Sequence, residues 1–153
     1  KMRNENPFDL PLSIRKFITV AAVLAMECEA VILDEPTAGQ DLYGIELLHN
    51  IIAELHAQGK TVITITHDIE FAAENFQRIV VMAHRQILKD GTPEEVFADE
   101  PVLNEAMLKG PCSGRLARRL NLHGEILTNE QFLDAFCRIY ERGASNEVIN
   151  KEE

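Results

Sequence analysis

Two adjacent carboxylates end a short apolar run in the first third of the chain. Residues 30–33 (Ala-Val-Ile-Leu) are apolar at every position, which is typical of a parallel strand buried on both faces. Asp34 and Glu35 follow directly. Ligands of parallel sheets bind at the carboxyl ends of the strands, and two acids there are costly unless a ligand uses their charge. A Mg²⁺–phosphate ligand would use this charge. Asp34 would help to hold the ion, and Glu35 would orient or deprotonate a water molecule.

A histidine follows the next apolar run. Residues 61–65 (Thr-Val-Ile-Thr-Ile) predict a second strand, and His67 comes two positions after it. An amphipathic helix, predicted over 42–58, separates the two strands, so they form a parallel strand–helix–strand unit. His67 is therefore expected at the same sheet edge as Asp34 and Glu35, where an imidazole could hydrogen-bond a γ-phosphate or hold the attacking water.

Both patterns have a purely structural alternative. Asp34 and Glu35 could cap the following turn, and a histidine after a strand is often a capping or packing residue. Two acids followed by Pro-Thr-Ala-Gly-Gln-Asp are a rarer pattern than a strand that ends in one acid. Together with His67, they favour the chemical interpretation. The other histidines show no spacing typical of metal ligands (His49, His56, His84 and His123).

The remaining pattern predicts an α/β domain that becomes helical toward its end. A helix is expected over 14–26, just after Pro11, and Asp41 is a candidate N-cap of the 42–58 helix, with Gly59 just past its end. Two further strands, 79–82 and 86–89, are expected at the sheet edge. Further helices are predicted over 69–76, 101–109, 114–121 and 129–142, with capping boxes at Thr92–Glu95 and Thr128–Gln131 and a frayed polar tail at 144–153.

Composition limits the classes of function. The chain has 153 residues, which suits one domain or a core with a small appendage, and a formal net charge of −10, which argues against binding nucleic acid. The three cysteines are far apart and are expected to be reduced thiols (Cys28, Cys112 and Cys137). No apolar run reaches the roughly 20 residues that span a bilayer, and no signal peptide is visible.

A phosphate-binding loop is not recognisable in the sequence. Gly59-Lys60-Thr61 ends like the motif Gly-x-x-x-x-Gly-Lys-[Ser/Thr], but position 54 is glutamate and the triplet lies between a helix and a strand, the reverse of the required order. We therefore interpret it as a helix end.

These motifs resemble those of ABC ATPases. Residues 30–41 are similar to the Walker B and D-loop segment, and His67 matches the switch histidine. Val-Leu-Ala-Met-Glu at 23–27, followed by Leu-Asp-Glu-Pro-Thr-Ala-Gly at 33–39, most resembles the ATPases of energy-coupling factor importers, as do the segment 91–97 and the helical end of the chain. The resemblance implies a partial P-loop NTPase (ABC/RecA-like) core with parallel strands and a C-terminal helical appendage.

The resemblance also assigns roles to residues. Asp34 would bind Mg²⁺ through water, Glu35 would be the catalytic base and His67 the γ-phosphate switch. Gln40 and Asp41 would lie in the D-loop and help to bind the cofactor, with Asp41 also making a contact across a dimer of ATPase domains. The cofactors would be ATP and Mg²⁺. The family's phosphate loop and glutamine loop would lie upstream of these residues, so we do not expect this chain alone to hydrolyse ATP.

One segment departs from the family pattern. The signature Leu-Ser-Gly-Gly-Gln aligns with Leu10, Pro11, Leu12, Ser13 and Ile14, of which only Leu10 matches. Proline has no N–H to offer a phosphate and leucine adds bulk where the backbone must approach closely, while Ser13 could cap the helix instead. The composite site that uses this segment is therefore expected to be weak or silent.

The resulting hypothesis is an ATPase subunit that powers an energy-coupling factor importer at the cytoplasmic face of the membrane. Its predicted partners are a transmembrane coupling subunit and a second ABC ATPase domain, in a heterodimer or a fused tandem. The predicted divisions are 1–109 for the ATPase part, 110–143 for the extension and 144–153 for the tail. The alternatives are an ABC ATPase outside transport and a non-enzymatic dimerising or regulatory relic.

Overall fold

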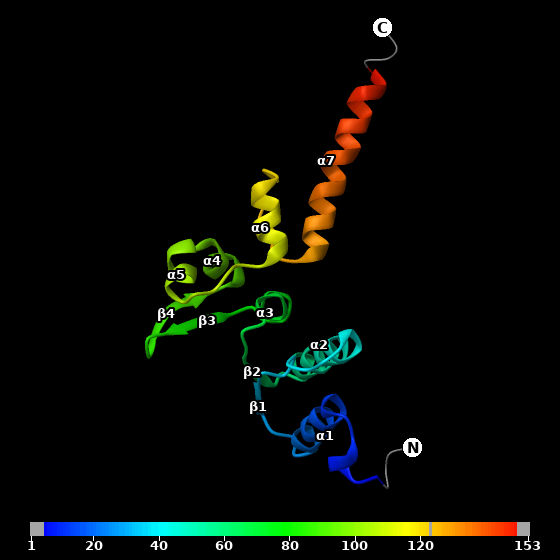
Figure 1. Cartoon of the computed structure of the whole chain (residues 1–153), viewed down its shortest axis with the longest axis vertical. Helices are drawn as coiled ribbons and strands as arrows, with labels where there is room; N and C mark the ends of the chain where they lie inside the picture. The colour runs from blue at the N-terminus through cyan, green and yellow to red at the C-terminus, as the bar shows by residue number, and fades with distance from the viewer. Residues whose placement is uncertain (1–4, 123, 150–153) are drawn as a thin grey trace. The chain divides into compact units, whose positions relative to one another are not determined.

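The computed structural model describes residues 5–122 and 124–149, and the chain divides into two compact units, Lys1–Asp68 and Ile69–Glu153 (Figure 1). The first unit contains the 3₁₀ turn η2 (Pro7–Asp9), helix α1 (Leu12–Leu24), strand β1 (Ala30–Asp34), helix α2 (Leu42–Ala57) and strand β2 (Thr61–Ile65). The second contains α3 (Ile69–Asn75), β3 (Ile79–Ala83), β4 (Gln86–Gly91), α4 (Pro93–Ala98), α5 (Glu100–Glu105), α6 (Cys112–Arg119) and α7 (Asn129–Ile149).

The predicted strand–helix–strand unit is present. β1 and β2 pair in parallel, with Ala30 opposite Thr61 and Asp34 opposite Ile65. Both strands therefore end at the same sheet edge, which is the geometry that the candidate site requires.

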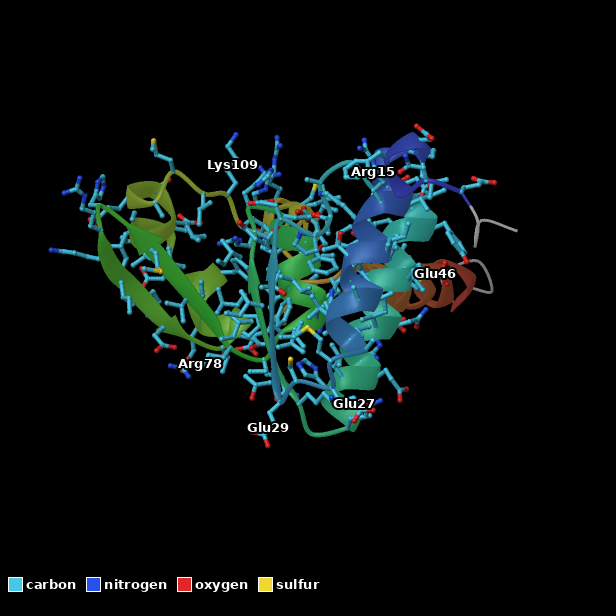
Figure 2. The ribbon with its side chains drawn as sticks, turned by 90° about the horizontal axis from the view of Figure 1, so that it is seen from below. Arg15, Glu27, Glu29, Glu46, Arg78 and Lys109 are labelled. Carbon is cyan, nitrogen blue, oxygen red and sulfur yellow. The ribbon has the colours of Figure 1, made fainter. Side chains whose placement is uncertain are left out.

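The sheet is covered on one face in this structure. Helices α1 and α2 both lie on the same side of β1 and β2 (Figures 1 and 2). The core residues Val31 and Leu33 of β1 are buried, as are Leu48, Ile52 and Leu55 of α2. Ile32 on the opposite face is 66% exposed, with Ile63 and Ile65 of β2 beside it at 50% and 57%. The prediction that both faces are buried is thus wrong for the described residues, because no element of the first unit packs on the face of Ile32.

Helix α2 begins and ends as the sequence predicted. The Asp41 side chain is its N-cap and accepts a hydrogen bond from the Gly44 N–H at 2.8 Å. Gly59 follows the C-cap residue Gln58 with φ +74°, a conformation in which glycine meets no Cβ penalty. These two residues fix where the helix leaves the turn after β1 and where β2 starts.

Helix α1 begins earlier than predicted. Its N-cap is Pro11, whose carbonyl accepts the hydrogen bond from the Arg15 N–H at 3.0 Å, and no side chain caps the helix. The prediction of Ser13 as a cap is wrong: Ser13 lies inside the first turn. The physical reason is that the proline ring holds φ at −53° and its extended ψ of 148° already gives the backbone geometry of an N-cap.

Strands β3 and β4 form a separate antiparallel sheet rather than the edge of the first one. They are joined at His84 and Arg85, which both have positive φ, as a tight two-residue hairpin turn requires. Their inner face packs on α4 and α5, and the core of the second unit consists of Val81, Val96, Phe97 and Leu103. The capping box at α4 is confirmed, with reciprocal bonds between Thr92 and Glu95.

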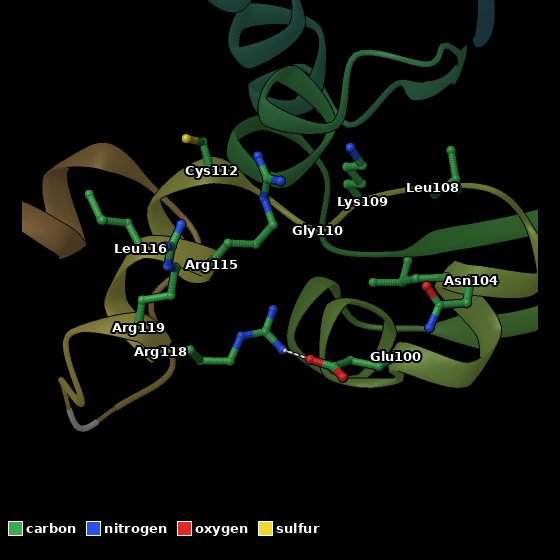
Figure 3. Close-up of a pocket in the computed structure, with 11 residues that line it drawn as sticks. Glu100, Asn104, Leu108, Lys109, Gly110, Cys112, Arg115, Leu116, Arg118 and Arg119 are labelled. Carbon is green, nitrogen blue, oxygen red and sulfur yellow. Dashed lines mark hydrogen bonds and ion pairs between the residues drawn. The ribbon is translucent and has the colours of Figure 1, made fainter.

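The C-terminal helices follow a short connecting segment. Helices α5 and α6 line a hollow, drawn in Figure 3. The second predicted capping box, between Thr128 and Gln131, is confirmed by hydrogen bonds of 3.2 Å in both directions. Helix α7 continues to Ile149, so the predicted tail from 144 is helical to that point, and its last four residues lie outside the described chain.

The helices and the cysteines bear on the questions of membrane spans and disulfides. None of the described helices is long and apolar enough to cross a bilayer. Cys28, Cys112 and Cys137 are free thiols.

Candidate functional site

The sheet edge brings together the acids of β1 and the histidine after β2. Asp34 is the last residue of β1, and the next residue, Glu35, donates its backbone N–H to the Ile65 carbonyl at 2.8 Å. This bond carries the pairing of the strands one residue beyond β1. Thr66 and His67 leave β2 at the same level, so the predicted juxtaposition of Glu35 and His67 is present.

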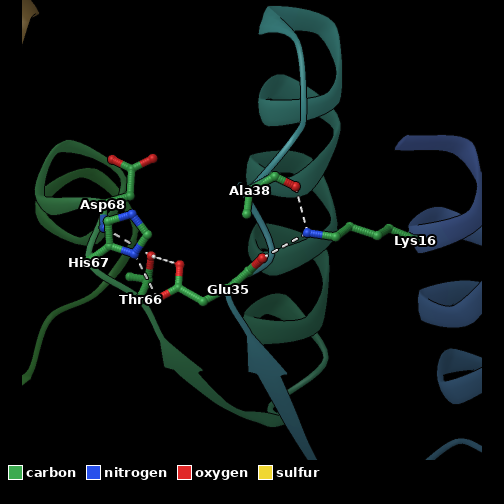
Figure 4. Close-up of polar contacts among 6 residues, drawn as sticks. All are labelled: Lys16, Glu35, Ala38, Thr66, His67 and Asp68. Carbon is green, nitrogen blue, oxygen red and sulfur yellow. Dashed lines mark hydrogen bonds and ion pairs between the residues drawn. The ribbon is translucent and has the colours of Figure 1, made fainter. Parts of the chain in front are cut away.

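Glu35 and His67 are in direct contact. The His67 Nδ1 lies 2.9 Å from Glu35 Oε1, and the Thr66 hydroxyl lies 3.5 Å from Glu35 Oε2 (Figure 4). Thr66 also accepts a hydrogen bond from the Asp68 backbone N–H at 3.0 Å, which shapes the turn after β2. The His67 side chain is 81% exposed and that of Glu35 36% exposed, so both can reach a ligand from solvent.

The Glu35 carboxylate raises the pKa of His67 above its ordinary value, first through the hydrogen bond and then through the charge itself. Asp68 adds a smaller effect in the same direction. An imidazolium at this position would attract the terminal phosphate of a nucleotide. While it is bonded to Glu35, however, it holds one oxygen of the carboxylate that would have to accept a proton from water.

Asp34 is available to a cation. It is exposed, and within the described part of the chain its carboxylate forms no hydrogen bond or ion pair. The described residues contain no group of three or more side chains able to hold a metal ion alone. One free carboxylate fits Mg²⁺ in the way this ion is usually held beside phosphates, with water and phosphate oxygens as the other ligands. The donors present are therefore compatible with Mg²⁺–ATP and not with a metal site made only of protein groups.

Gln40 and Asp41 lie at the end of the turn that leads into α2. The Gln40 N–H donates to the Thr37 carbonyl at 3.0 Å, and the Gln40 Oε1 is buried without a hydrogen-bond donor among the described residues. One oxygen of Asp41 is engaged in capping α2. Both residues border the site through the backbone, and their contacts to nucleotide or to a second ATPase domain remain predictions.

Sequence reasoning missed Lys16. Its ammonium group, on α1, donates to the carbonyl oxygens of Glu35 at 3.1 Å and of Ala38 at 2.5 Å (Figure 4). Glu35 has φ +45°, a left-handed conformation that is unfavourable for a residue with a Cβ. Lys16 therefore helps to hold a strained turn on which the candidate base is mounted. No local pattern around residue 16 signals this, because the contact spans 19 residues.

The signature-like segment Leu10, Pro11, Leu12, Ser13 and Ile14 lies at the start of the same helix. Leu10 is buried, and the rest form the first turn of α1. In the described structure no hydrogen bond joins this segment to Asp34, Glu35 or His67. Helix α1 is instead connected to the site by Lys16, which lies about half a helical turn beyond Ile14, the last residue of the signature-like segment.

The strand-end acids and the histidine at one edge of a parallel sheet are the arrangement expected of an ABC ATPase. Comparisons with known proteins agree with this class. Among solved structures, the chain matches cbiO1 from Clostridium perfringens, described as part of the ABC transporter complex cbiONQ. The TM-score is 0.56 with 30% identity, over 76% of this chain and 46% of that one. An ATP-binding cassette of an ABC transporter matches with a TM-score of 0.58 and 25% identity, over 66% and 42% of the chains. The predicted α/β fold of the P-loop NTPase class is confirmed.

Curated relatives indicate which group of ABC ATPases the chain resembles. The chain is 36% identical over 150 residues to the energy-coupling factor transporter ATP-binding protein EcfA2 of Mycoplasmopsis synoviae, covering 96% of this chain and 48% of the relative. It is 39% identical over 118 residues to the protein of the same name from Methanospirillum hungatei, covering 77% and 30%. No family model matches the chain.

The chain is thus a relative of ABC ATPases of the energy-coupling factor group, as its motifs predicted. It spans about half the length, or less, of the curated relatives given above.

Proposed function

We propose that this chain supplies the Walker B and switch-histidine part of an ATP site in an ABC ATPase that powers an importer of the energy-coupling factor type. The observation that carries this proposal is the contact between Glu35 and His67 at the ends of two parallel strands, next to the free carboxylate of Asp34. A capping role does not explain this arrangement, because the Glu35 carboxylate contacts the side chains of His67 and Thr66, and within the described residues it accepts no hydrogen bond from an N–H group of the following turn.

The positions of the residues support the following proposed roles. Bound Mg²⁺–ATP supplies the phosphoanhydride to be cleaved and the cation that Asp34 helps to hold through water. Glu35 accepts a proton from the attacking water once His67 has moved off its carboxylate. His67 donates a hydrogen bond to the terminal phosphate, and its raised pKa favours the charged form that binds an anion well. Hence nucleotide binding and the release of Glu35 are one event.

The partners follow from the relatives and from the signature-like segment. A second ABC ATPase domain supplies an intact signature to the site that contains Glu35, in a heterodimer or a fused tandem. A transmembrane coupling subunit anchors the pair at the cytoplasmic face of the membrane. Gln40 and Asp41 contribute to the contact between the two ATPase domains.

The test is ATP turnover by the complete protein paired with its partner domain. Glu35→Gln removes the base and keeps the shape, so we expect turnover to fall by a hundredfold or more, within the usual effect of general-base catalysis. Glu46→Gln, at an exposed position of α2, is the matched control and should change turnover less than twofold. Unchanged turnover in Glu35→Gln would show that Glu35 is not the base.

A second candidate function is a subunit that dimerises or regulates without hydrolysing ATP. Pro11 and Leu12 favour it, because the first removes a donor and the second adds bulk where a phosphate would bind. Nucleotide binding separates the two functions. The regulatory subunit would pair with its partner equally well with and without Mg²⁺–ATP, whereas the ATPase subunit would pair more tightly with it. Co-purification with membrane proteins separates both from an ABC ATPase outside transport.

A further inference from the structure

A hollow of about 550 Å³ in the second unit has no role in the ATP site described above. It lies between α5 and α6 and the segment that connects them (Figure 3). A volume of this size is in the range of small-molecule sites. Its walls come from one unit of the fold and include the side chains of Glu100, Leu103, Asn104, Lys109, Arg115 and Arg118.

The lining is basic in an acidic chain. The whole sequence has 25 acidic and 15 basic residues, but the lining contains four cations and one carboxylate. That carboxylate, on Glu100, is 2.9 Å from the Arg118 guanidinium. Lys109, Arg115 and Arg119 are left without a carboxylate in the lining. The lining therefore carries an excess of three positive charges (four cations against one carboxylate).

The arginines of α6 face this hollow because the other side of the helix is fixed. Ser113 donates its hydroxyl hydrogen to the Leu127 carbonyl at 2.8 Å, and Ala117, one turn later, is buried. A Cβ at Gly114 would lie 2.6 Å from the Ile126 carbonyl oxygen, so the helix backbone lies directly on the 126–127 segment. The Cys112 N–H, at the first turn, donates to the Glu70 carboxylate at 3.0 Å.

Helix geometry explains only part of this charge. Arg118 and Arg119 lie in the last turn of α6, where cations interact favourably with the helix dipole. Arg115 is in the middle of the helix and Lys109 lies outside it, so the dipole does not account for them. Arg115 and Arg119 are four residues apart, a spacing at which like charges destabilise a helix. An anion between them would remove this repulsion.

We propose that this hollow binds a ligand through two or more phosphate groups. Lysine and arginine present only hydrogen-bond donors, and the guanidinium fork matches phosphate oxygens. Several unpaired cations call for a multiply charged anion, and the buried Leu103 gives the site an apolar floor. A soluble polyphosphate and the headgroup of an anionic lipid that carries two phosphates share this chemistry. The proposal is independent of the ATP site.

The experiment is calorimetric titration of the full chain with sodium pyrophosphate at low salt, together with sedimentation with vesicles that contain cardiolipin, whose headgroup carries two phosphates. We expect saturable binding in at least one assay, weakened tenfold or more by Arg115→Gln/Arg119→Gln. The matched control, Arg85→Gln/Arg138→Gln, removes the same charge from exposed positions elsewhere and should keep affinity within twofold. Thermal melting of both variants checks that they fold.

The results distinguish a soluble phosphate ligand from a lipid headgroup, and one set of results overturns the proposal. Pyrophosphate binding that depends on Arg115 and Arg119 supports a soluble phosphate ligand. Vesicle binding with the same dependence, and no response to pyrophosphate, supports a lipid headgroup. The proposal is overturned if neither probe binds, or if the two double variants lose affinity equally, because the binding would then reflect net charge alone.

Discussion

The Glu35 carboxylate is engaged in this structure by the group that would have to leave it during hydrolysis. His67 Nδ1 occupies Oε1 and the Thr66 hydroxyl is near Oε2. While Oε1 is bonded to the His67 ring, that oxygen is not free to accept a proton from water. The pair therefore describes a resting arrangement, in which a terminal phosphate competes with Glu35 for His67.

The Glu35–His67 contact predicts a measurable titration. Glu35→Gln should lower the pKa of His67 toward its ordinary value of 6.5, because it removes the carboxylate hydrogen bond and the negative charge that raise it. NMR titration of the histidine ring protons checks this. If the His67 pKa is the same in wild type and variant, the contact is not populated in solution.

The same contact has a consequence for stability, with a definite sign. A group whose pKa is raised by folding stabilises the folded state below its unfolded pKa, and this contribution is lost as pH rises through the folded-state pKa. The wild type should therefore lose stability relative to Glu35→Gln as pH rises from roughly 6 to 8. Melting temperatures of the two proteins across this range give the difference, in which the other histidines cancel.

Lys16 should matter for turnover as well as for stability. Lys16→Met removes two hydrogen bonds to the turn that carries Glu35, so we expect a loss of about 1 kcal/mol in unfolding free energy, since one of the bonds is exposed. In the complete ATPase, kcat should fall several-fold with little change in KM, and Lys16→Arg should restore part of it.

Lys60→Met is the matched control for Lys16. Lys60 also donates to a backbone carbonyl, that of Cys28, at 3.1 Å, but at the opposite end of the strands. It should cost similar stability and leave kcat unchanged. If both variants lower kcat equally, the effect of Lys16 is general loosening of the unit and not positioning of Glu35.

At the scale of elements, local chemistry predicted the ends of helices well. The cap at Asp41 and the two capping boxes depend on residues within four positions of each other, so the sequence contains the whole interaction. The start of α1 was predicted two residues late, because Pro11 was treated as a barrier before the helix and not as its cap. The end of α7 was placed too early because its last turns carry no apolar stripe.

The candidate site was predictable for a related reason. A parallel strand–helix–strand unit requires both strand ends to meet at one edge, so the types of residues 34, 35 and 67 were sufficient to place them together. Which atoms would touch was not predictable. The Lys16 contact depends on where α1 lies over the turn, and the exposure of Ile32 depends on which elements cover the sheet. Both are properties of packing between distant segments.

Helix α6 offers a prediction in which two effects have opposite signs. Helix propensity favours alanine over glycine by about 1 kcal/mol, so Gly114→Ala alone would stabilise an isolated helix. In this fold the added Cβ would meet the Ile126 carbonyl oxygen at 2.6 Å, and the contact is with backbone. We expect a net destabilisation of about 1–3 kcal/mol, typical of overpacking. Urea unfolding with an unchanged m-value measures it, and a gain in stability would show that α6 is free to move away from the 126–127 segment.

At the scale of the whole molecule, the open face of the sheet and the limited coverage of the relatives both suggest that this face is covered in the assembly. Ile32, Ile63 and Ile65 form an exposed apolar group beside the candidate site. The chain matches 48% of the Mycoplasmopsis synoviae relative and 46% of the Clostridium perfringens structure. In the assembly that we propose, this apolar face would be covered by another part of the ATPase.

The two composite sites of that assembly make a final prediction. Glu35 would serve the site that takes its signature from the partner, and the segment at 11–13 would serve the other. Restoring Ser-Gly-Gly with Pro11→Ser, Leu12→Gly and Ser13→Gly returns a backbone N–H, a hydroxyl and room for close approach. It should raise ATP turnover of the paired complex, and the increase should persist when Glu35→Gln is added, because the two changes act at different sites. If Glu35→Gln abolishes the increase, both sets of residues serve one site and the asymmetric arrangement is wrong.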